Sequence, residues 1–164
     1  MILSEYRSKS GEQILYTGQP DLNKLEQLAV GYGDIWHSSF EQGYKNAFQD
    51  LAIQSSVLFW YINDFEGLDE CVSWRINPNF FAVRKSVWET LKGFDSDYEN
   101  LQMQALDFGY NSLRNQGVVP LYVRGLYKEV VTEKITISPR DRYVFYIKNF
   151  KIDHALFMLY RKGI

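Results

Sequence analysis

The stretch Asn77–Asp95 reads NPNFFAVRKSVWETLKGFD, and its pattern changes from that of a strand to that of a helix within a few residues. Its first part continues an extended segment that we expect over Cys71–Val83. Ser86 and Glu89 stand three residues apart, which is the spacing of a capping box at the start of a helix. We expect a short helix here that Gly93 ends. A strand followed at once by a helix indicates a mixed α/β fold.

Similar patterns on both sides extend this α/β organisation along the chain. They predict strands at residues 13–17, 55–63, 118–124 and 127–132, and helices that begin at Asp21, Ser38, Tyr98 and Ser138. The segment at 55–63 is apolar on both faces, which is typical of a central strand. No repeat or linker divides the chain. We therefore expect a single domain over residues 1–164, an α+β mixed sheet with flanking helices.

The composition is that of an ordinary globular domain. The chain has 164 residues, of which 46% are hydrophobic, and 18 basic and 20 acidic residues leave a net charge of -2. This balance gives no field that attracts nucleic acid. The single cysteine, Cys71, favours a reducing compartment, and the longest apolar run, Val57–Ile62, is too short to span a membrane. We expect a cytoplasmic protein without a transmembrane segment; peripheral membrane contact through the aromatic and basic C-terminal helix is an open alternative.

Four short motifs in the second half of the chain follow one another in a recognisable order. They are FAVRK at Phe81–Lys85, KGFD at Lys92–Asp95, DF at Asp107–Phe108 and LRNQG at Leu113–Gly117. In this order they resemble the C-terminal, acceptor-binding half of family-2-type glycosyltransferases with the GT-A fold. The resemblance covers about residues 70–160. It implies a partial GT-A-like architecture, that of nucleotide-diphospho-sugar transferases.

The resemblance also implies an activity, the transfer of a sugar from a nucleotide-sugar donor to a glycan or lipid-linked acceptor. A transferase that inverts the anomeric centre needs a carboxylate that takes the proton of the acceptor hydroxyl. Asp107 stands at the second acidic position of the family's motif and is our candidate for this catalytic base. Asp64 and Glu66 follow the apolar strand at 55–63 and offer hard oxygen ligands. They are candidates for holding Mn²⁺ or Mg²⁺, which would neutralise the departing diphosphate.

Five further residues are candidates for binding the acceptor or its sugar rings. Aromatic faces pack well against the C–H edges of a sugar, and side-chain amides and carboxylates bind hydroxyls. The candidates are Trp74, Asn77, Asn79, Asp95 and Tyr98. Each has a structural alternative: the aromatic residues also suit a core, the asparagines also suit the turn around Pro78, and Asp95 also suits a helix cap or loop contact.

Two departures from the family keep other functions open. Ala105 occupies the position of the family's first acidic residue, and the N-terminal donor-binding half is not evident in the sequence. The alternative function is a non-catalytic carbohydrate-binding, protein-binding or assembly module derived from a truncated glycosyltransferase. An unrelated α+β protein with chance matches is a third possibility. If the donor half is missing, an open sheet surface needs cover, so we expect a homodimer or a partner chain.

Overall fold

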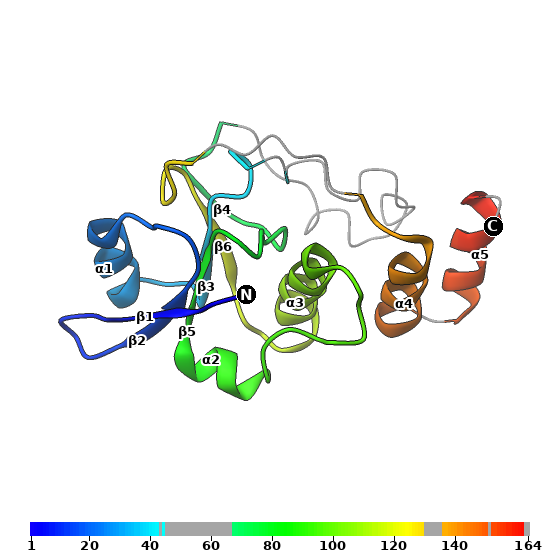
Figure 1. Cartoon of the computed structure of the whole chain (residues 1–164), viewed down its shortest axis with the longest axis horizontal. Helices are drawn as coiled ribbons and strands as arrows, with labels where there is room; N and C mark the ends of the chain where they lie inside the picture. The colour runs from blue at the N-terminus through cyan, green and yellow to red at the C-terminus, as the bar shows by residue number, and fades with distance from the viewer. Residues whose placement is uncertain (43, 45–66, 130–135, 151, 163–164) are drawn as a thin grey trace.

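The computed structural model describes residues 1–42, 44, 67–129, 136–150 and 152–162 (Figure 1). Within these ranges the chain forms a six-stranded sheet with the order β1-β2-β5-β3-β6-β4. The strands are β1 Ser4–Arg7, β2 Gln13–Tyr16, β3 Ile35–His37, β4 Glu70–Val72, β5 Phe81–Arg84 and β6 Pro120–Val123. The helices are α1 Leu22–Val30, α2 Lys85–Thr90, α3 Leu101–Asn115, α4 Pro139–Asn149 and α5 Ile152–Lys162.

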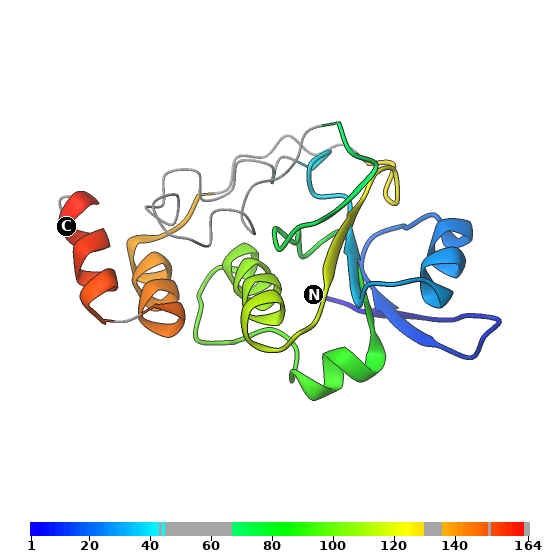
Figure 2. The ribbon, with the colours of Figure 1, turned by 180° about the vertical axis from the view of Figure 1, so that it is seen from behind.

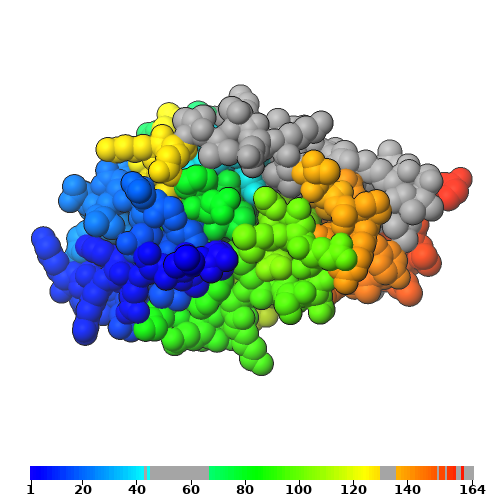
Figure 3. Space-filling model, viewed as in Figure 1, coloured from blue at the N-terminus to red at the C-terminus, as the bar shows by residue number. Residues whose placement is uncertain are grey.

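The sheet is mixed and has helices on both faces. Strands β3 and β6 run parallel, and the other pairings between described strands are antiparallel. Helix α1 lies on one face and α3 on the other, and the view from behind shows the same layers (Figures 1 and 2). Helices α4 and α5 follow α3 away from the sheet, so they form one end of an elongated molecule (Figure 3). The predicted mixed α/β sheet with flanking helices is confirmed.

The stretch from which the fold was predicted forms a strand and a helix as expected, but the helix cap differs. Strand β5 passes directly into α2, whose N-cap is Arg84 and has no side-chain cap hydrogen bond. The predicted capping box of Ser86 and Glu89 is therefore wrong, because both residues already lie inside the helix. Gly93 does follow the helix end, with φ of 66°. A Cβ atom there would lie 2.7 Å from the Trp88 ring.

The helix predicted to begin at Ser38 is also wrong in the described residues, because 39–42 form a turn rather than a helix. The Ser38 hydroxyl instead donates a 2.7 Å hydrogen bond to the Val123 carbonyl and accepts one of 3.2 Å from the Tyr127 amide. It therefore ties the end of β3 to the end of β6. The remainder of that predicted helix, apart from residue 44, and the predicted strand at 55–63 lie outside the described residues.

The C-terminal helices begin as the sequence predicts. Pro139 opens α4, and the Ser138 hydroxyl caps it by accepting a 3.1 Å hydrogen bond from the Asp141 amide. The single helix expected from Ser138 is divided into α4 and α5. In the part of the chain that is described, no helix is long and apolar enough to span a membrane.

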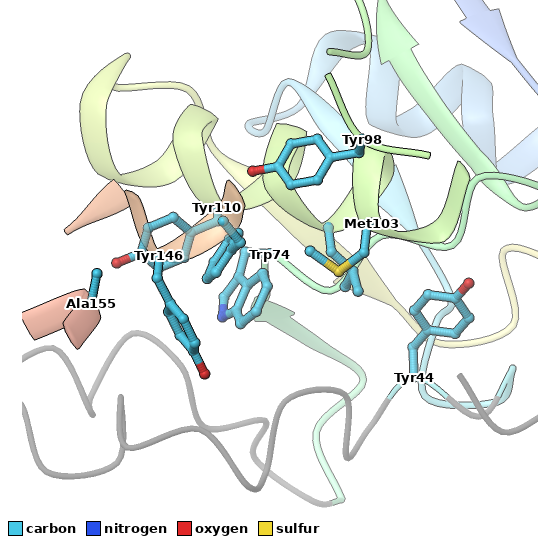
Figure 4. Close-up of a cluster of buried hydrophobic side chains, with 9 residues drawn as sticks. Tyr44, Trp74, Tyr98, Met103, Tyr110, Tyr146 and Ala155 are labelled. Carbon is cyan, nitrogen blue, oxygen red and sulfur yellow. The ribbon is translucent and has the colours of Figure 1, made fainter. Parts of the chain in front are cut away.

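A close backbone contact places α3 against the segment that follows β4. A Cβ atom on Gly109 would lie 2.1 Å from the Trp74 carbonyl oxygen, so only glycine allows this approach. The Trp74 ring is fully buried, packs edge-to-face against Tyr110 at 5.4 Å and stacks on Phe145 at 6.4 Å. Figure 4 shows this core cluster, to which the post-β4 segment, α3 and α4 all contribute. It fixes the relative positions of α3 and α4.

Candidate functional site

Asp107 lies in the middle of α3 and is only 7% exposed. Its position follows from the sequence: Asn100 caps the helix by accepting a 2.8 Å hydrogen bond from the Gln102 amide, and buried residues then recur along α3. Met103 and Tyr110, four residues before and three after Asp107, belong to the core between α3 and α4. The Asp107 carboxylate thus lies on the side of α3 that packs into the core. Burying a carboxylate costs free energy unless the group has hydrogen-bond partners.

Asn149, at the end of α4, provides the closest partner. Its Nδ2 atom donates a 2.6 Å hydrogen bond to Asp107 Oδ1 and a 3.0 Å hydrogen bond to the Phe145 carbonyl. The second bond fixes the amide, so the first one orients the carboxylate. The ring of Tyr98 is 2% exposed, and its hydroxyl lies near Asp107 without a hydrogen bond of normal geometry to the described residues.

Burial controls the protonation of this pair. It raises the pKa of Asp107 above its ordinary value, and the contacts with Asn149 and Tyr98 reduce the increase without cancelling it. The pKa of Tyr98 is also raised, first by burial and then by the negative charge of Asp107. A carboxylate with a raised pKa holds a proton more strongly than a surface aspartate. It is therefore better suited to accept one from a hydroxyl.

Lys148 connects this pair to the loop that carries the KGFD motif. Its ammonium group pairs with Asp95 and, at 2.8 Å, with Asp97, and it lies 5.3 Å from the centre of the Tyr98 ring. Burial alone would lower the pKa of Lys148, but the bonds to the two carboxylates raise it overall. We call the group of Asp95, Asp97, Tyr98, Asp107, Lys148 and Asn149 the Asp107 cluster. It brings one cation and three acidic groups to one end of the α3–α4 contact.

Three of the residues predicted from the sequence therefore come together, namely Asp95, Tyr98 and Asp107. Within the cluster Asp95 holds the loop, because it accepts a 2.9 Å hydrogen bond from the Asp97 amide and also pairs with Lys148. Burial raises the pKa of Asp95, and these contacts more than offset it, so that the pKa is lowered overall. This arrangement corresponds to the loop contact that the sequence offered as an alternative for Asp95.

The predicted residues near Pro78 have a different setting. Trp74 is fully buried and Asn77 is 3% exposed, which corresponds to the structural alternatives that the sequence offered, a core position for Trp74 and the turn around Pro78 for Asn77. The Asn77 side chain accepts a 2.9 Å hydrogen bond from the Asn79 amide, which shapes the turn, whereas Asn79 itself is exposed. Trp74 shares the core cluster of Tyr98 (Figure 4) and presents no open ring face to a sugar.

The predicted metal ligands, Asp64 and Glu66, lie outside the described residues. Among the residues that are described, no three histidine, cysteine, aspartate or glutamate side chains form a group suited to a metal ion.

Sequence reasoning missed the α4 side of the cluster, Lys148 and Asn149. A local signal for Asn149 existed, because it lies four residues after the buried Phe145 and so on the same side of α4. A polar residue that continues a buried stripe needs a polar partner. The sequence does not show that this partner is Asp107, 42 residues earlier.

A second polar network lies at the end of β3. His37 is fully buried; its Nε2 atom lies 2.8 Å from the Ser73 carbonyl oxygen and its Nδ1 atom 2.7 Å from the Ser39 hydroxyl. The Ser39 hydroxyl also accepts a 3.2 Å hydrogen bond from the Asn77 amide. Burial lowers the pKa of His37 to about 4, so the ring is neutral near pH 7. These contacts join the post-β4 segment to β3, and we interpret them as structural.

Comparison with known proteins gives no match: no family model fits the chain, and no curated protein or solved structure is significantly similar to it.

Proposed function

We propose that this chain is a glycosyltransferase-related domain in which Asp107 is the catalytic base. The observation that carries the proposal is a nearly buried carboxylate with a raised pKa, oriented by the Asn149 amide, at the acidic position of the GT-A-like motif. The donor in this proposal is a nucleotide sugar, and the acceptor is a hydroxyl of a glycan or of a lipid-linked glycan.

The chemistry of sugar transfer assigns roles to Asp107 and Asn149. The acceptor oxygen forms a bond to the anomeric carbon, and the bond from that carbon to the diphosphate oxygen breaks. The acceptor proton moves to Asp107, and the nucleoside diphosphate leaves with the bonding electrons. Asn149 is a positioning residue, because its bond to Oδ1 leaves the other carboxylate oxygen to take the proton.

The metal remains a prediction from the sequence. Asp64 and Glu66 would bind Mn²⁺ or Mg²⁺ through carboxylate oxygens, the ligand type that both ions prefer. A bound ion would offset the negative charge of the leaving diphosphate. The measurement is the dependence of donor binding on added Mn²⁺ in the wild type and in Asp64→Ala.

The second candidate function is a non-catalytic module that binds a carbohydrate or a partner protein, as a homodimer or with another chain. The observation that favours it is the apolar surface of α5. Several large apolar side chains of this helix are half or more exposed, namely Ile152, Leu156, Phe157 and Tyr160. An apolar face of this kind marks a contact surface in many proteins. Light scattering on the eluted protein distinguishes a monomer from a dimer.

The experiment that separates the two functions uses UDP-, GDP-, CMP- and dTDP-sugars, with and without Mn²⁺. Donor binding is read from the rise in melting temperature, and turnover from the release of nucleoside diphosphate. The variant is Asp107→Asn, and the matched control is Glu89→Gln, which changes an exposed carboxylate on α2. The proposal expects Asp107→Asn to bind donor but lose turnover, whereas Glu89→Gln keeps both. Binding without turnover in the wild type would favour the module.

A further inference from the structure

A pocket of about 530 Å³ opens between α1 and the strands β6 and β4. Helices α1 and α3 lie on opposite faces of the sheet (Figures 1 and 2). Because α1 lines the pocket and α3 carries Asp107, the pocket and the Asp107 cluster are on opposite faces as well. This volume is within the range of about 300–1,000 Å³ that small-molecule sites occupy. The pocket is therefore large enough for one or two sugar rings, and it is separate from the site described above.

The floor of the pocket is apolar and carries an exposed aromatic side chain. Leu28 of α1 and two residues of β6, Leu121 and Val123, form the floor. Tyr32 lines the pocket just after α1 and is 62% exposed. The next residue, Gly33, has φ of 98° and turns the chain toward β3, and the Trp36 side chain donates a 3.5 Å hydrogen bond to the Tyr32 carbonyl. The backbone that presents Tyr32 is thus fixed.

The charged groups of the rim balance one another. Lys24 and Arg124 contribute positive charges, and Asp69 and Glu70 contribute negative ones. The Lys24 ammonium donates a 2.8 Å hydrogen bond to the Arg124 carbonyl, and the Arg124 guanidinium pairs with Asp69 at 3.3 Å. An anionic ligand such as a nucleoside diphosphate would meet two carboxylates as well as the two cations. The rim therefore does not favour a strongly charged ligand of either sign.

A neutral ligand rich in hydroxyl groups fits this lining best. A hydroxyl both donates and accepts hydrogen bonds, so it can use the donors of Lys24 and Arg124 and the acceptors of Asp69 and Glu70 together. The C–H face of a sugar ring packs on an aromatic side chain, and Tyr32 presents one. We propose that this pocket binds a neutral carbohydrate, with one ring on Tyr32 and its hydroxyls on the charged rim. This inference does not rest on the role of Asp107.

The test is a titration of the ¹⁵N-labelled full chain, followed by amide NMR, with four neutral oligosaccharides: maltotriose, cellotriose, mannotriose and triacetylchitotriose. We expect at least one of them to shift the amide signals of Tyr32 and Gly125, which line the pocket. Tyr32→Ala should weaken this binding at least tenfold. Tyr143→Ala is the matched control, because it removes a tyrosine that is 47% exposed on α4. The control should bind like the wild type.

Two further variants and two nucleotides complete the test. Glu70→Gln should weaken binding several-fold, because it removes the negative charge from one acceptor at the rim while the melting temperature stays unchanged. The proposal is overturned if none of the four oligosaccharides shifts pocket signals, or if Tyr143→Ala weakens binding as much as Tyr32→Ala. It is also overturned if UDP or GDP shifts these signals and the sugars do not. Binding that persists in Asp107→Asn supports a site independent of the Asp107 cluster.

Discussion

Asp107, between α3 and α4, is 7% exposed, whereas the side chain of Asp69, on the other side of the sheet, is 85% exposed. The first carboxylate is held by a neighbouring helix, and burial raises its pKa. The second pairs with Arg124 at the rim of an open pocket. The α3 face therefore shifts the pKa of a buried acid, whereas the α1 face leaves its charged groups open to solvent.

The largest effect is expected from Gly109→Ala on the α3 face. The added Cβ atom would lie 2.1 Å from the Trp74 carbonyl oxygen, so α3 must move away from the post-β4 segment. We expect a loss of about 3 kcal/mol or more in the free energy of unfolding, the upper range for overpacking. Chemical denaturation measures it. Gly11→Ala is a control that also replaces a glycine, since nothing lies within 4 Å of its added Cβ atom, although its φ of 90° adds some strain. A smaller loss for Gly109→Ala than for this control would contradict the contact.

The next effect concerns the partner of the buried carboxylate. Asn149→Ala leaves Asp107 Oδ1 without its 2.6 Å hydrogen bond, which should cost about 1–3 kcal/mol. Asp107→Asn should cost less, because it removes a charge that burial disfavours. Denaturation of both variants at neutral pH measures this order, and the reverse order would mean that the charge of Asp107 stabilises the fold.

The raised pKa of Asp107 also makes the free energy of unfolding depend on pH. The folded-state pKa of Asp107 is raised, so the unfolded chain loses this proton at a lower pH than the folded protein does. The contribution of Asp107 to the free energy of unfolding is therefore fully present below its pKa in the unfolded chain, which is about 4. This contribution falls as the pH rises through the pKa of Asp107 in the folded protein. We expect the stability of the wild type relative to Asp107→Asn to fall over that interval. Denaturation of both proteins across the acid range tests it, and a relative stability that rises with pH would contradict the raised pKa.

Lys148→Met should have a smaller effect with the opposite pH dependence. The pKa of Asp95 is lowered overall, so its pairing with Lys148 stabilises the fold above the unfolded pKa and loses this contribution as the pH falls. Because both side chains are partly exposed, solvent screening limits the loss to below about 1 kcal/mol. Unfolding at low and high salt measures it. An effect that grows with salt would contradict an ionic contact.

The smallest effect is expected on the α1 face. Lys24→Met removes the 2.8 Å hydrogen bond to the Arg124 carbonyl at an exposed site, and we expect almost no change in melting temperature. Oligosaccharide binding should nevertheless weaken. A large loss of stability would mean that the rim of the pocket is structural.

The local parts of the fold could be predicted from the sequence, and the tertiary parts could not. The change from strand β5 to helix α2 follows from residue types that are neighbours in the chain. Strand β3 has only three residues, and it is a strand because it pairs with β5 and β6 on its two sides. The helix predicted from Ser38 did not form there for a similar reason, since the Ser38 hydroxyl bonds to the Val123 carbonyl at the end of β6.

The candidate site also has a part that could be predicted from local sequence and a part that depends on tertiary packing. Asp107 and Asp95 were found from short motifs, but the burial that raises the pKa of Asp107 depends on α4 packing against α3. The sequence left Trp74 open between a core position and a sugar contact, because its neighbours Arg75 and Asn77 are polar; in the structure these neighbours are buried as well. A polar residue in the sequence indicates the surface only where the fold offers its polar groups no hydrogen-bond partner in the interior.

The most direct test of the role of Asp107 is the pH dependence of sugar transfer, measured beside the titration of the Asp107 carboxyl by ¹³C NMR. A base must be deprotonated, so transfer should fall as the pH falls through the pKa of Asp107. We predict that the acid limb of the rate profile coincides with this titration, above the ordinary aspartate value of about 3.9, and that Asp107→Asn lacks the activity. A rate that stays constant while Asp107 titrates, or that persists in Asp107→Asn, would contradict the account.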